Sequence, residues 1–371
     1  PGGGTDRLPH NDQSVEHRHH TDMKKQTTAL ALFSGGLDSI LAARVVAAQG
    51  IRVVAVKFVS PFFDYPILSE PGTYHQRIEK LYGLEVVVED ISEEYLMLLR
   101  QPVYGFGKNF NPCIDCKIFM FDRARQMMEE MGASFMISGE VLGQRPMSQR
   151  RDTLNVIERD SGSRNILLRP LSAKLLRPTE AEEQGLVDRS RLLDFSGRSR
   201  SRQIALAEEF GITEFPAPAG GCRLADPILS KRIARVYAGD FVIDPENIDS
   251  GDILCLMTGR QFLLPGGGWL VLGRNEKDNQ VLERLKKTGD ILICMHEHPG
   301  PTALLRRTGL LYDSAARLAA DKELAMGLVV RYAKKVDGRC RPQEVLIHED
   351  GDISCRRQEP VEGLEYRDWM L

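Results

Sequence analysis

Short apolar runs alternate with longer amphipathic segments in the first half of the chain. Runs rich in Val, Ile, Leu, Ala and Phe predict four buried strands, at 29–33, 52–59, 84–88 and 134–138. Helical patterns follow three of these runs, at about 38–49, 70–82 and 116–131. Strands that alternate with helices in this way are typical of βαβ units, so we expect an α/β domain with a parallel sheet.

The pattern changes towards the C-terminus, where apolar runs are short and less regular. They predict strands at 253–257, 261–264, 269–272 and 291–295, with helices at 275–287 and 312–335. The segments 250–257 and 288–295 have similar sequences, and we interpret both as strand entries. This order indicates a smaller α+β module, for which we expect an antiparallel sheet.

These patterns divide the chain into a disordered tail, two domains and a linker. The predicted bounds are 1–26 for the tail, 27–235 for the α/β domain, 236–246 for the linker and 247–371 for the α+β module. The tail holds four of the eight histidines and almost no large apolar residue. A metal-binding histidine tract is the alternative interpretation of the tail.

Composition narrows the classes of protein that fit. A length of 371 residues favours two domains, and a net charge of −3 excludes a uniformly basic chain. We expect no membrane partner, because no apolar run reaches the length of a transmembrane helix. Seven cysteines without a secretion signal indicate a cytoplasmic protein whose thiols bind metal or take part in catalysis.

The loop Ser34-Gly-Gly-Leu-Asp-Ser39 lies between the first predicted strand and the first predicted helix. Two glycines allow a tight turn, and the free N–H groups of the helix N-terminus favour an anion. Asp38 would repel a phosphate unless a cation lay between them, which indicates Mg²⁺. A plain strand-to-helix turn is the alternative, and the chain contains no GxxxxGK[ST] or GxGxxG motif.

This hexapeptide resembles the SGGxDS loop of the PP-loop ATP pyrophosphatases, which cleave ATP between its α- and β-phosphates and adenylate a carbonyl or carboxyl oxygen. The resemblance implies that ATP is bound here and that its pyrophosphate is held by Ser34, Gly35, Gly36, Asp38 and Ser39. From the topology of the family, main chain near Lys57, Phe58 and Gly139 is expected to hold the adenosine.

Three cysteines are candidates for chemistry. Cys113 and Cys116 form a CxxC at the start of a helical pattern, where the helix field should lower a thiol pKa, and Cys222 follows a glycine pair in a distant loop. Such a loop is able to fold back towards the CxxC. The residues leave three alternatives open: a [4Fe–4S] cluster with one open iron, a persulfide with a resolving cysteine, and a zinc-binding or merely buried pair.

The same layout resembles the PP-loop enzymes that thiolate tRNA, of the 2-thiouridine and 4-thiouridine synthetase type. In one branch a CxxC and one distant cysteine hold a [4Fe–4S] cluster, and Cys113, Cys116 and Cys222 match that arrangement. The resemblance covers about 27–235 and implies that Asp38 and these cysteines are catalytic, that tRNA is the partner, and that sulfide or a carrier protein donates the sulfur. The persulfide route remains the alternative.

Arginines provide candidate RNA contacts. Between 145 and 202 there are 13 basic residues against 8 acidic ones. Solvated or ion-paired side chains are the alternative to phosphate contacts. In the C-terminal module, Gly273-Arg-Asn275 with Asn279 and Pro299-Gly300 resembles the NFACT-R domain, which implies RNA binding there. The predicted RNA-binding residues are Arg145, Arg150, Arg151, Arg198, Arg200, Arg274 and Asn275.

The remaining histidines and cysteines give weaker signals. His296 and His298 alternate near a strand end and could form a metal pair, although structural roles are favoured. Cys255, Cys294, Cys340 and Cys355 show no ligand spacing, and we interpret them as core or incidental. The leading hypothesis is therefore an ATP-dependent tRNA uridine sulfurtransferase. The alternatives are a PP-loop enzyme that inserts sulfur into or amidates a small molecule, and a non-catalytic RNA-binding protein.

Overall fold

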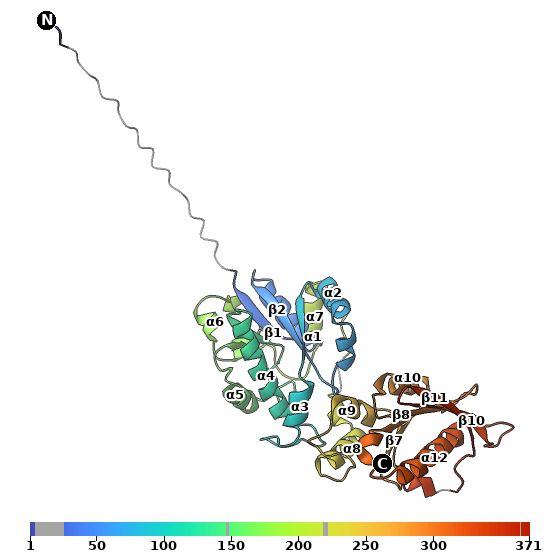
Figure 1. The fold of residues 1–371 in the computed structure, drawn as a ribbon. Coiled ribbons are helices and arrows are strands. Elements are labelled where there is room, and N and C mark those ends of the chain that lie inside the picture. The colour runs from blue at the N-terminus through green and yellow to red at the C-terminus, as the bar shows by residue number, and fades with distance from the viewer. Residues whose placement is uncertain (4–25, 146–147, 218–221, 364) are drawn as a thin grey trace.

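The computed structural model describes residues 1–3, 26–145, 148–217, 222–363 and 365–371. These residues form two lobes, each built on its own sheet (Figure 1). The predicted tail therefore falls almost entirely outside the described residues. No helix in the described part of the chain is both long and apolar enough to cross a membrane.

The N-terminal lobe contains a five-stranded sheet in which every pair is parallel, as predicted. The sheet order is β3-β2-β1-β4-β5, so β1 is central. The strands are β1 (Thr28–Leu32), β2 (Arg52–Val59), β3 (Glu85–Asp90), β4 (Phe135–Ser138) and β5 (Leu167–Leu168).

Helices cover both faces of this sheet because alternate residues of β1 point in opposite directions. Ala29 and Ala31 pack in one apolar cluster with the helices on the first face, and Leu30 packs in a second cluster on the other face. The first face carries α1 (Leu37–Ala47), α2 (Pro71–Tyr82), α6 (Glu180–Glu183) and α7 (Ser201–Glu209). The other carries α3 (Ser92–Leu98), α4 (Cys113–Glu130) and α5 (Arg151–Asp160).

The C-terminal lobe contains a six-stranded antiparallel sheet, in agreement with the predicted class. Its order is β11-β10-β8-β9-β7-β6. The strands are β6 (Arg260–Leu263), β7 (Trp269–Leu272), β8 (Ile291–Met295), β9 (Ala303–Arg306), β10 (Gln343–Glu349) and β11 (Asp352–Gln358). One face packs on α12 (Ala315–Tyr332), and α10 (Glu276–Leu285) packs on the other, next to the short α11 (Thr308–Leu311).

The strand predicted at 253–257 is wrong, because this segment belongs to helix α9 (Ser250–Leu256). The helix begins in a capping box: Asp249 accepts from the Asp252 backbone N–H and Asp252 accepts from that of Asp249, both at 2.9 Å. In the similar segment 288–295, the Lys287 backbone N–H donates to Asp290 in the same way, at 2.8 Å, but Lys287 has no side-chain oxygen to accept a bond in return. Asp290 accepts from the Arg307 backbone N–H, and the chain continues into β8. Aspartate at 249 and lysine at 287 thus distinguish the helical segment from the strand of similar sequence.

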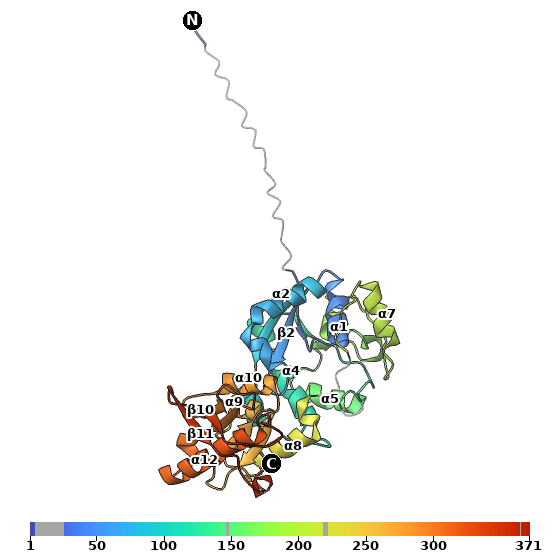
Figure 2. The same cartoon turned by 90° about the vertical axis from the view of Figure 1, so that its right-hand side faces the viewer.

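Helix α8 (Pro227–Tyr237) lies between the two lobes (Figure 2). Its Tyr237 hydroxyl donates to the carbonyl of Leu96 in α3 at 3.0 Å, and the other side of the helix packs on α9. The segment predicted as a linker, 236–246, contributes buried Val236 and Ile243 to the cluster that also contains Leu30 of β1. One apolar core therefore runs from the parallel sheet into the C-terminal lobe.

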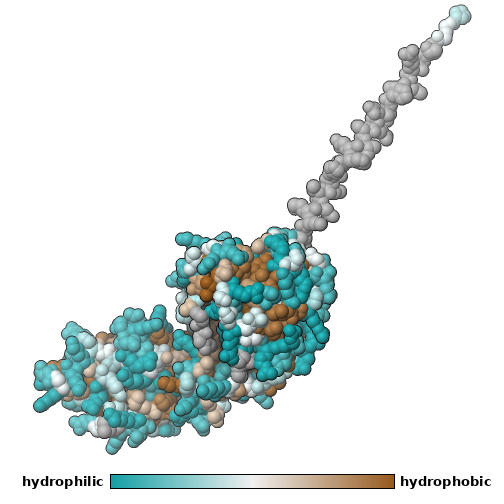
Figure 3. Space-filling view, turned by 180° about the vertical axis from the view of Figure 1, so that it is seen from behind, coloured by the Kyte–Doolittle hydropathy of each residue, from teal (hydrophilic) through white to brown (hydrophobic). Residues whose placement is uncertain are grey.

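The rear face of the molecule is mostly hydrophilic (Figure 3). Apolar residues gather on that face over the N-terminal lobe.

Candidate functional site

The glycine loop follows β1 at the carboxyl edge of the parallel sheet, where ligands bind in folds of this kind. Gly35 has φ of 81°, a conformation that favours glycine. Ser39 closes the turn, since its Oγ donates to the carbonyl of Gly36 at 2.8 Å and accepts from Ser34 Oγ at 3.2 Å. The loop thus enters α1 with two hydroxyl groups and the first helical N–H groups on one short segment.

Lys57 supports the loop from the neighbouring strand β2. Its buried ammonium donates to the carbonyl of Ser34 at 2.6 Å and forms an ion pair with Asp64. Phe58, the next residue, is also buried. The Lys57 side chain therefore holds the turn, and only its main chain remains for the adenosine contact that topology predicted.

Gly139 follows β4 and lies directly against the loop. An added Cβ would be 2.6 Å from both the N and Cα atoms of Ser39, and 2.7 Å from the carbonyl carbon of Asp38. Real Cβ atoms do not approach backbone so closely. Only glycine lets the end of β4 pack on the loop in this geometry.

Asp38 lies at the start of α1, and among the described residues only one of its two carboxylate oxygens accepts a hydrogen bond. Its Oδ2 accepts from Gln144 Nε2 at 2.8 Å and is 3.7 Å from the Arg200 guanidinium. Its Oδ1 is buried and has no hydrogen-bond partner among the described residues. A free carboxylate oxygen beside an anion-binding loop fits a Mg²⁺ ligand, because protein Mg²⁺ sites use one or two carboxylates together with substrate phosphates.

Glu140 connects this edge of the sheet to α4. Its buried carboxylate pairs with Lys117 of α4 and accepts from Arg169 Nε at 2.9 Å. Burial acts to raise the pKa of Glu140, but the charges and hydrogen bonds of Lys117 and Arg169 outweigh burial and hold that pKa below its usual value. The carboxylate is thus fixed in its ionised form, and its partner Lys117 directly follows Cys116 in α4.

The loop that carries Cys222 folds back on the CxxC segment, as the sequence analysis expected. Asn109 Nδ2 donates to the carbonyl of Ala225 at 2.6 Å, and the backbone N–H of Phe110 donates to Ser230 Oγ at 3.3 Å. Cys222 caps a short 3₁₀ turn immediately before α8. The two cysteine-bearing segments are therefore joined by hydrogen bonds, although 218–221 lies outside the described residues.

The three thiols are free and have hydrogen-bond donors around them. Cys113 Sγ accepts from Asn111 Nδ2 at 3.1 Å, and the Tyr95 hydroxyl bonds Cys116. Burial raises the pKa of Cys116 to about 12, and the hydrogen bond from Tyr95 offsets this only in part. The predicted lowering of this pKa by the helix field is therefore wrong. Burial also raises the pKa of Cys222.

The spacing of the thiols distinguishes between kinds of metal centre. These three described sulfur atoms do not all lie within 4.8 Å of one another. A single Zn²⁺ with Zn–S bonds of about 2.3 Å needs sulfurs within about 4 Å of each other. A [4Fe–4S] cluster attaches each thiolate to a different iron, so it needs a wider spacing of the sulfur atoms than one zinc ion does.

The predicted RNA-binding residues differ in their surroundings. Arg200 faces Asp38, and Asn275 caps α10 by accepting from the Asp278 backbone. Arg274 pairs with Asp278 at 2.8 Å. Exposed side chains remain at Arg145, Arg150, Arg151 and Arg198, of which Arg150 pairs with Asp152 and Arg151 donates to the carbonyl of Leu175.

Sequence reasoning missed several residues of the site. Tyr95, Lys117 and Arg169 lie far from any motif whose spacing would mark them as partners. Each is buried or nearly so. Tyr95 lies against Cys116, and Lys117 and Arg169 both pair with Glu140. Buried polar side chains on three separate elements become recognisable as one site only when the fold brings them together.

The chain thus has a glycine turn after its central parallel strand and an acidic residue at the start of the following helix, an arrangement that suits the binding of a phosphate group. Residues 24–174 match the family model described as "Thiamine biosynthesis protein (ThiI)". This match confirms the predicted resemblance to PP-loop enzymes of the tRNA thiouridine synthetase type within that segment. It does not extend to the C-terminal module, whose NFACT-R resemblance stays a prediction.

Two curated proteins are similar to the chain. A "Probable tRNA sulfurtransferase" of Thermococcus kodakarensis is 28% identical over 141 residues, which cover 37% of this chain and 35% of the relative. The "tRNA-specific 2-thiouridylase MnmA" of Syntrophotalea carbinolica is 29% identical over 126 residues, or 31% of this chain and 35% of the relative. The chain thus spans about a third of the length of each of these relatives.

Among solved structures, a 4-thiouridine synthetase–RNA complex with bound ATP is similar to the chain, with 23% identity and a TM-score of 0.36. The similarity covers 50% of this chain and 41% of that one. A score of this size does not establish a shared fold over the whole chain.

Replacing Gly139 with alanine should disturb the loop. The new Cβ would force the backbone of Ser39 to move, and overpacking of this kind costs about 1–3 kcal/mol in the free energy of unfolding. Denaturant unfolding and calorimetric ATP titration would measure both effects. Gly72→Ala in α2 is the matched control: its new Cβ would have no described atom within 4 Å, so it should lower neither stability nor ATP affinity. Unaltered stability and ATP affinity in Gly139→Ala would contradict the close packing.

Proposed function

We propose that this protein is an ATP-dependent tRNA uridine sulfurtransferase, which adenylates a uracil carbonyl oxygen and replaces it with sulfur. The observation that carries the proposal is a continuous set of contacts from the loop to the cysteines. The backbone of Asp38 and Ser39 packs on Gly139, the adjacent Glu140 pairs with Lys117, and Lys117 follows Cys116 in α4. ATP chemistry and thiol chemistry would therefore share one edge of the sheet.

In the first step, the uracil carbonyl oxygen attacks the α-phosphate of ATP, and pyrophosphate leaves. The loop N–H groups and the hydroxyls of Ser34 and Ser39 would stabilise negative charge on the leaving pyrophosphate. Asp38 Oδ1 would hold Mg²⁺, which supplies charge neutralisation at the phosphates. The target base must leave its stack to reach this edge.

In the second step, hydrosulfide attacks the activated carbon and AMP leaves. The hydrosulfide proton stays on the thiouracil, at the ring nitrogen that lost its own proton when the oxygen was adenylated. The step needs no change of oxidation state when the donor supplies sulfur as sulfide. Cys113, Cys116 and Cys222 would hold a [4Fe–4S] cluster, which supplies an iron without a protein ligand as a place to carry the sulfur. If the donor is instead a persulfide carrier, two thiols would suffice.

The partner is proposed to be tRNA, supported by the names of the two curated relatives. The exposed arginines of the N-terminal lobe and the C-terminal module would contact its backbone. Pyrophosphate release, measured with and without bulk tRNA, tests this. Release that depends on tRNA supports the proposal. Release that depends on a small molecule favours the alternative PP-loop chemistry, and no release at all favours a non-catalytic RNA-binding protein.

Asp38→Asn should abolish ATP-to-AMP turnover while leaving the fold intact. Asparagine keeps an oxygen for the Gln144 hydrogen bond but loses the charge that would bind Mg²⁺, so Mg²⁺-dependent turnover should fall by at least about 100-fold. Asp38→Ala should behave the same way. Asp194→Asn is a control, because Asp194 lies on the surface in an ion pair with Arg202. Normal turnover in Asp38→Ala with substrate present would rule out the proposed role of the loop.

The three site cysteines should behave as a set. Serine at Cys113, Cys116 or Cys222 should each remove thiolation and each lose iron, because a cluster with three protein ligands has no spare one. Iron, sulfide and thiouridine content of anaerobic preparations would measure this. Serine at Cys255, Cys294, Cys340 or Cys355 should change neither iron content nor thiolation.

The persulfide route gives another pattern in the same experiment. Cys222 and one cysteine of the CxxC would be essential, the other would be dispensable, and no iron would copurify. Full activity in an iron-free preparation would exclude the cluster while leaving ATP-dependent thiolation intact.

Exposed arginines should control the salt dependence of tRNA binding. Arg145→Ala and Arg198→Ala should each reduce the slope of log affinity against log salt by about one, since each lost phosphate contact releases fewer counterions. Arg274→Ala should change the slope less, because Arg274 is already paired with Asp278. Filter binding over a salt series would measure the slopes, and equal slopes in all variants would exclude these contacts.

A further inference from the structure

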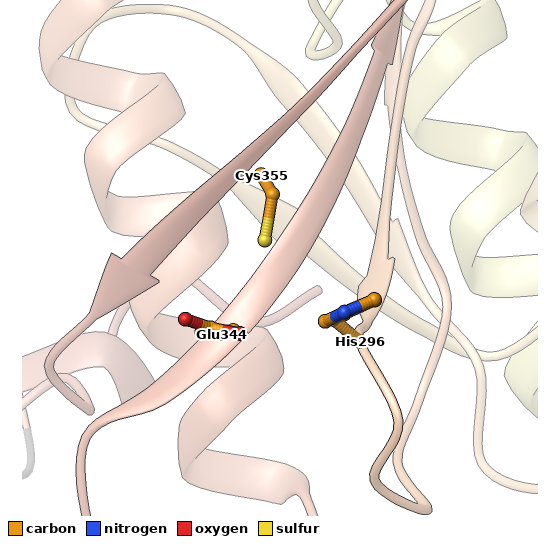
Figure 4. Close-up of side chains that lie close together, drawn as sticks. All are labelled: His296, Glu344 and Cys355. Atoms are coloured by element: carbon orange, nitrogen blue, oxygen red, sulfur yellow. The ribbon is translucent and has the colours of Figure 1, made fainter.

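We infer a second metal site, independent of the proposed thiolation site, on the sheet of the C-terminal lobe. His296, Glu344 and Cys355 each present one ligand atom, and these three atoms all lie within 4.8 Å of one another. Figure 4 shows the three side chains gathered beside β8, β10 and β11. The residues are separated by up to 59 positions along the chain, so only the sheet brings them together.

The strand register explains why the three side chains share one face. Met295 pairs with Val345, and the His296 backbone N–H donates to the carbonyl of Glu344 at 3.0 Å. On the other side of β10, Cys355 pairs with Leu346, two residues from Glu344. Side chains two apart on a strand point to the same face, and diagonal neighbours on adjacent strands are within reach of each other.

This face is opposite the one that packs on α12. Val345 and Ile347, the alternate residues of β10, lie in the core formed with that helix. Glu344 and Cys355 are exposed, and His296 is partly buried. A metal ion from solvent can therefore reach the group without any rearrangement of the core.

The three side chains offer the kinds of ligand atom that bind transition-metal ions. Imidazole nitrogen, thiolate sulfur and carboxylate oxygen are the three ligand types of protein Zn²⁺ sites, with bonds of about 2.0–2.3 Å. Donors bound to one ion at such lengths lie about 3–4 Å apart, so small side-chain rotations would complete the site. Glu297 Oε1 lies 3.8 Å from His296 Nε2, beyond hydrogen-bond distance, so the neighbouring carboxylate leaves the ring free to rotate towards the ion. A water molecule would take the remaining position of a tetrahedral ion.

The structure brings His296 together with Glu344 and Cys355, and not with His298, the partner that the sequence suggested for a metal pair. His298 Nε2 lies 2.8 Å from the carbonyl of Lys334, and His298 is not a member of the ligand group. Cys294, on β8, faces His348 at 4.0 Å instead. His298 and Cys294 therefore provide matched controls: the same residue types, nearby, outside the group.

Binding has a structural consequence, because β11 is the edge strand of the sheet and nearly all its residues are exposed. An ion held by β8, β10 and β11 side chains would fasten this edge strand to its neighbours. Binding requires a deprotonated Cys355, so one proton leaves the thiol as the metal enters.

The test is titration of the full-length chain with Zn²⁺, and with Co²⁺ as a spectroscopic probe. Wild type is compared with Cys355→Ser, His296→Ala and Glu344→Gln, and with the controls Cys294→Ser and His298→Ala. Thiolate-to-cobalt absorption excludes binding at the histidines of residues 1–22, which offer no sulfur. The cysteines of the proposed thiolation site are present in every variant, so any metal that they bind contributes equally to wild type and variants.

We expect the three ligand variants to bind one metal equivalent fewer, or at least about 10- to 100-fold more weakly, since loss of an outer partner alone has that effect. The Cys355→Ser variant should also lose part of the cobalt–thiolate absorption. Zn²⁺ should slow amide hydrogen exchange across 343–358 in wild type and in both controls, but not in the ligand variants. Circular dichroism would confirm that each variant is folded.

Equal stoichiometry and affinity in wild type and all three ligand variants would overturn the site. Loss in Cys355→Ser without loss in His296→Ala would overturn a shared site for the three residues. Iron content and thiolation should be unchanged in Cys355→Ser, so failure of this inference and failure of the proposed function are distinguishable.

Discussion

The close packing of Gly139 on the backbone of Asp38 and Ser39 is the constraint on which the candidate site depends. It fixes the end of β4 against the turn after β1, and it thereby sets the position of Glu140, the next residue. Glu140 in turn aligns Lys117 and hence the first turns of α4, where the CxxC lies. A methyl group at position 139 would push these parts away from one another, so the arrangement of the loop relative to the CxxC depends on a residue without a side chain.

Much of the N-terminal lobe was predictable from sequence, because β1, β2 and β4 are buried on both faces and their sequences are continuous apolar runs. The loop at 34–39 was predictable because its glycine and serine residues come directly after the apolar run of β1. The C-terminal lobe was harder. Segment 250–257 carries the apolar pattern of a strand, yet the Asp249–Asp252 capping box makes it helical, and β9, β10 and β11 went unnoticed.

The polar parts of the site were only partly predictable. Asp38 and the cysteines stand out because they belong to short motifs. Lys117, Arg169 and Tyr95 do not, because their roles arise from partners more than twenty positions away. The thiol pKa of Cys116 shows the same limit. The sequence reveals a helix start, but only the fold reveals the neighbouring groups that shield this partly buried thiol from water.

The apolar cluster that extends from β1 through α8 to the C-terminal sheet has a consequence for how the molecule behaves as a whole. Two lobes that share one core cannot swing about a hinge without exposing it, and they should lose structure in a single cooperative transition. The C-terminal lobe should therefore keep a constant distance and angle from the glycine loop.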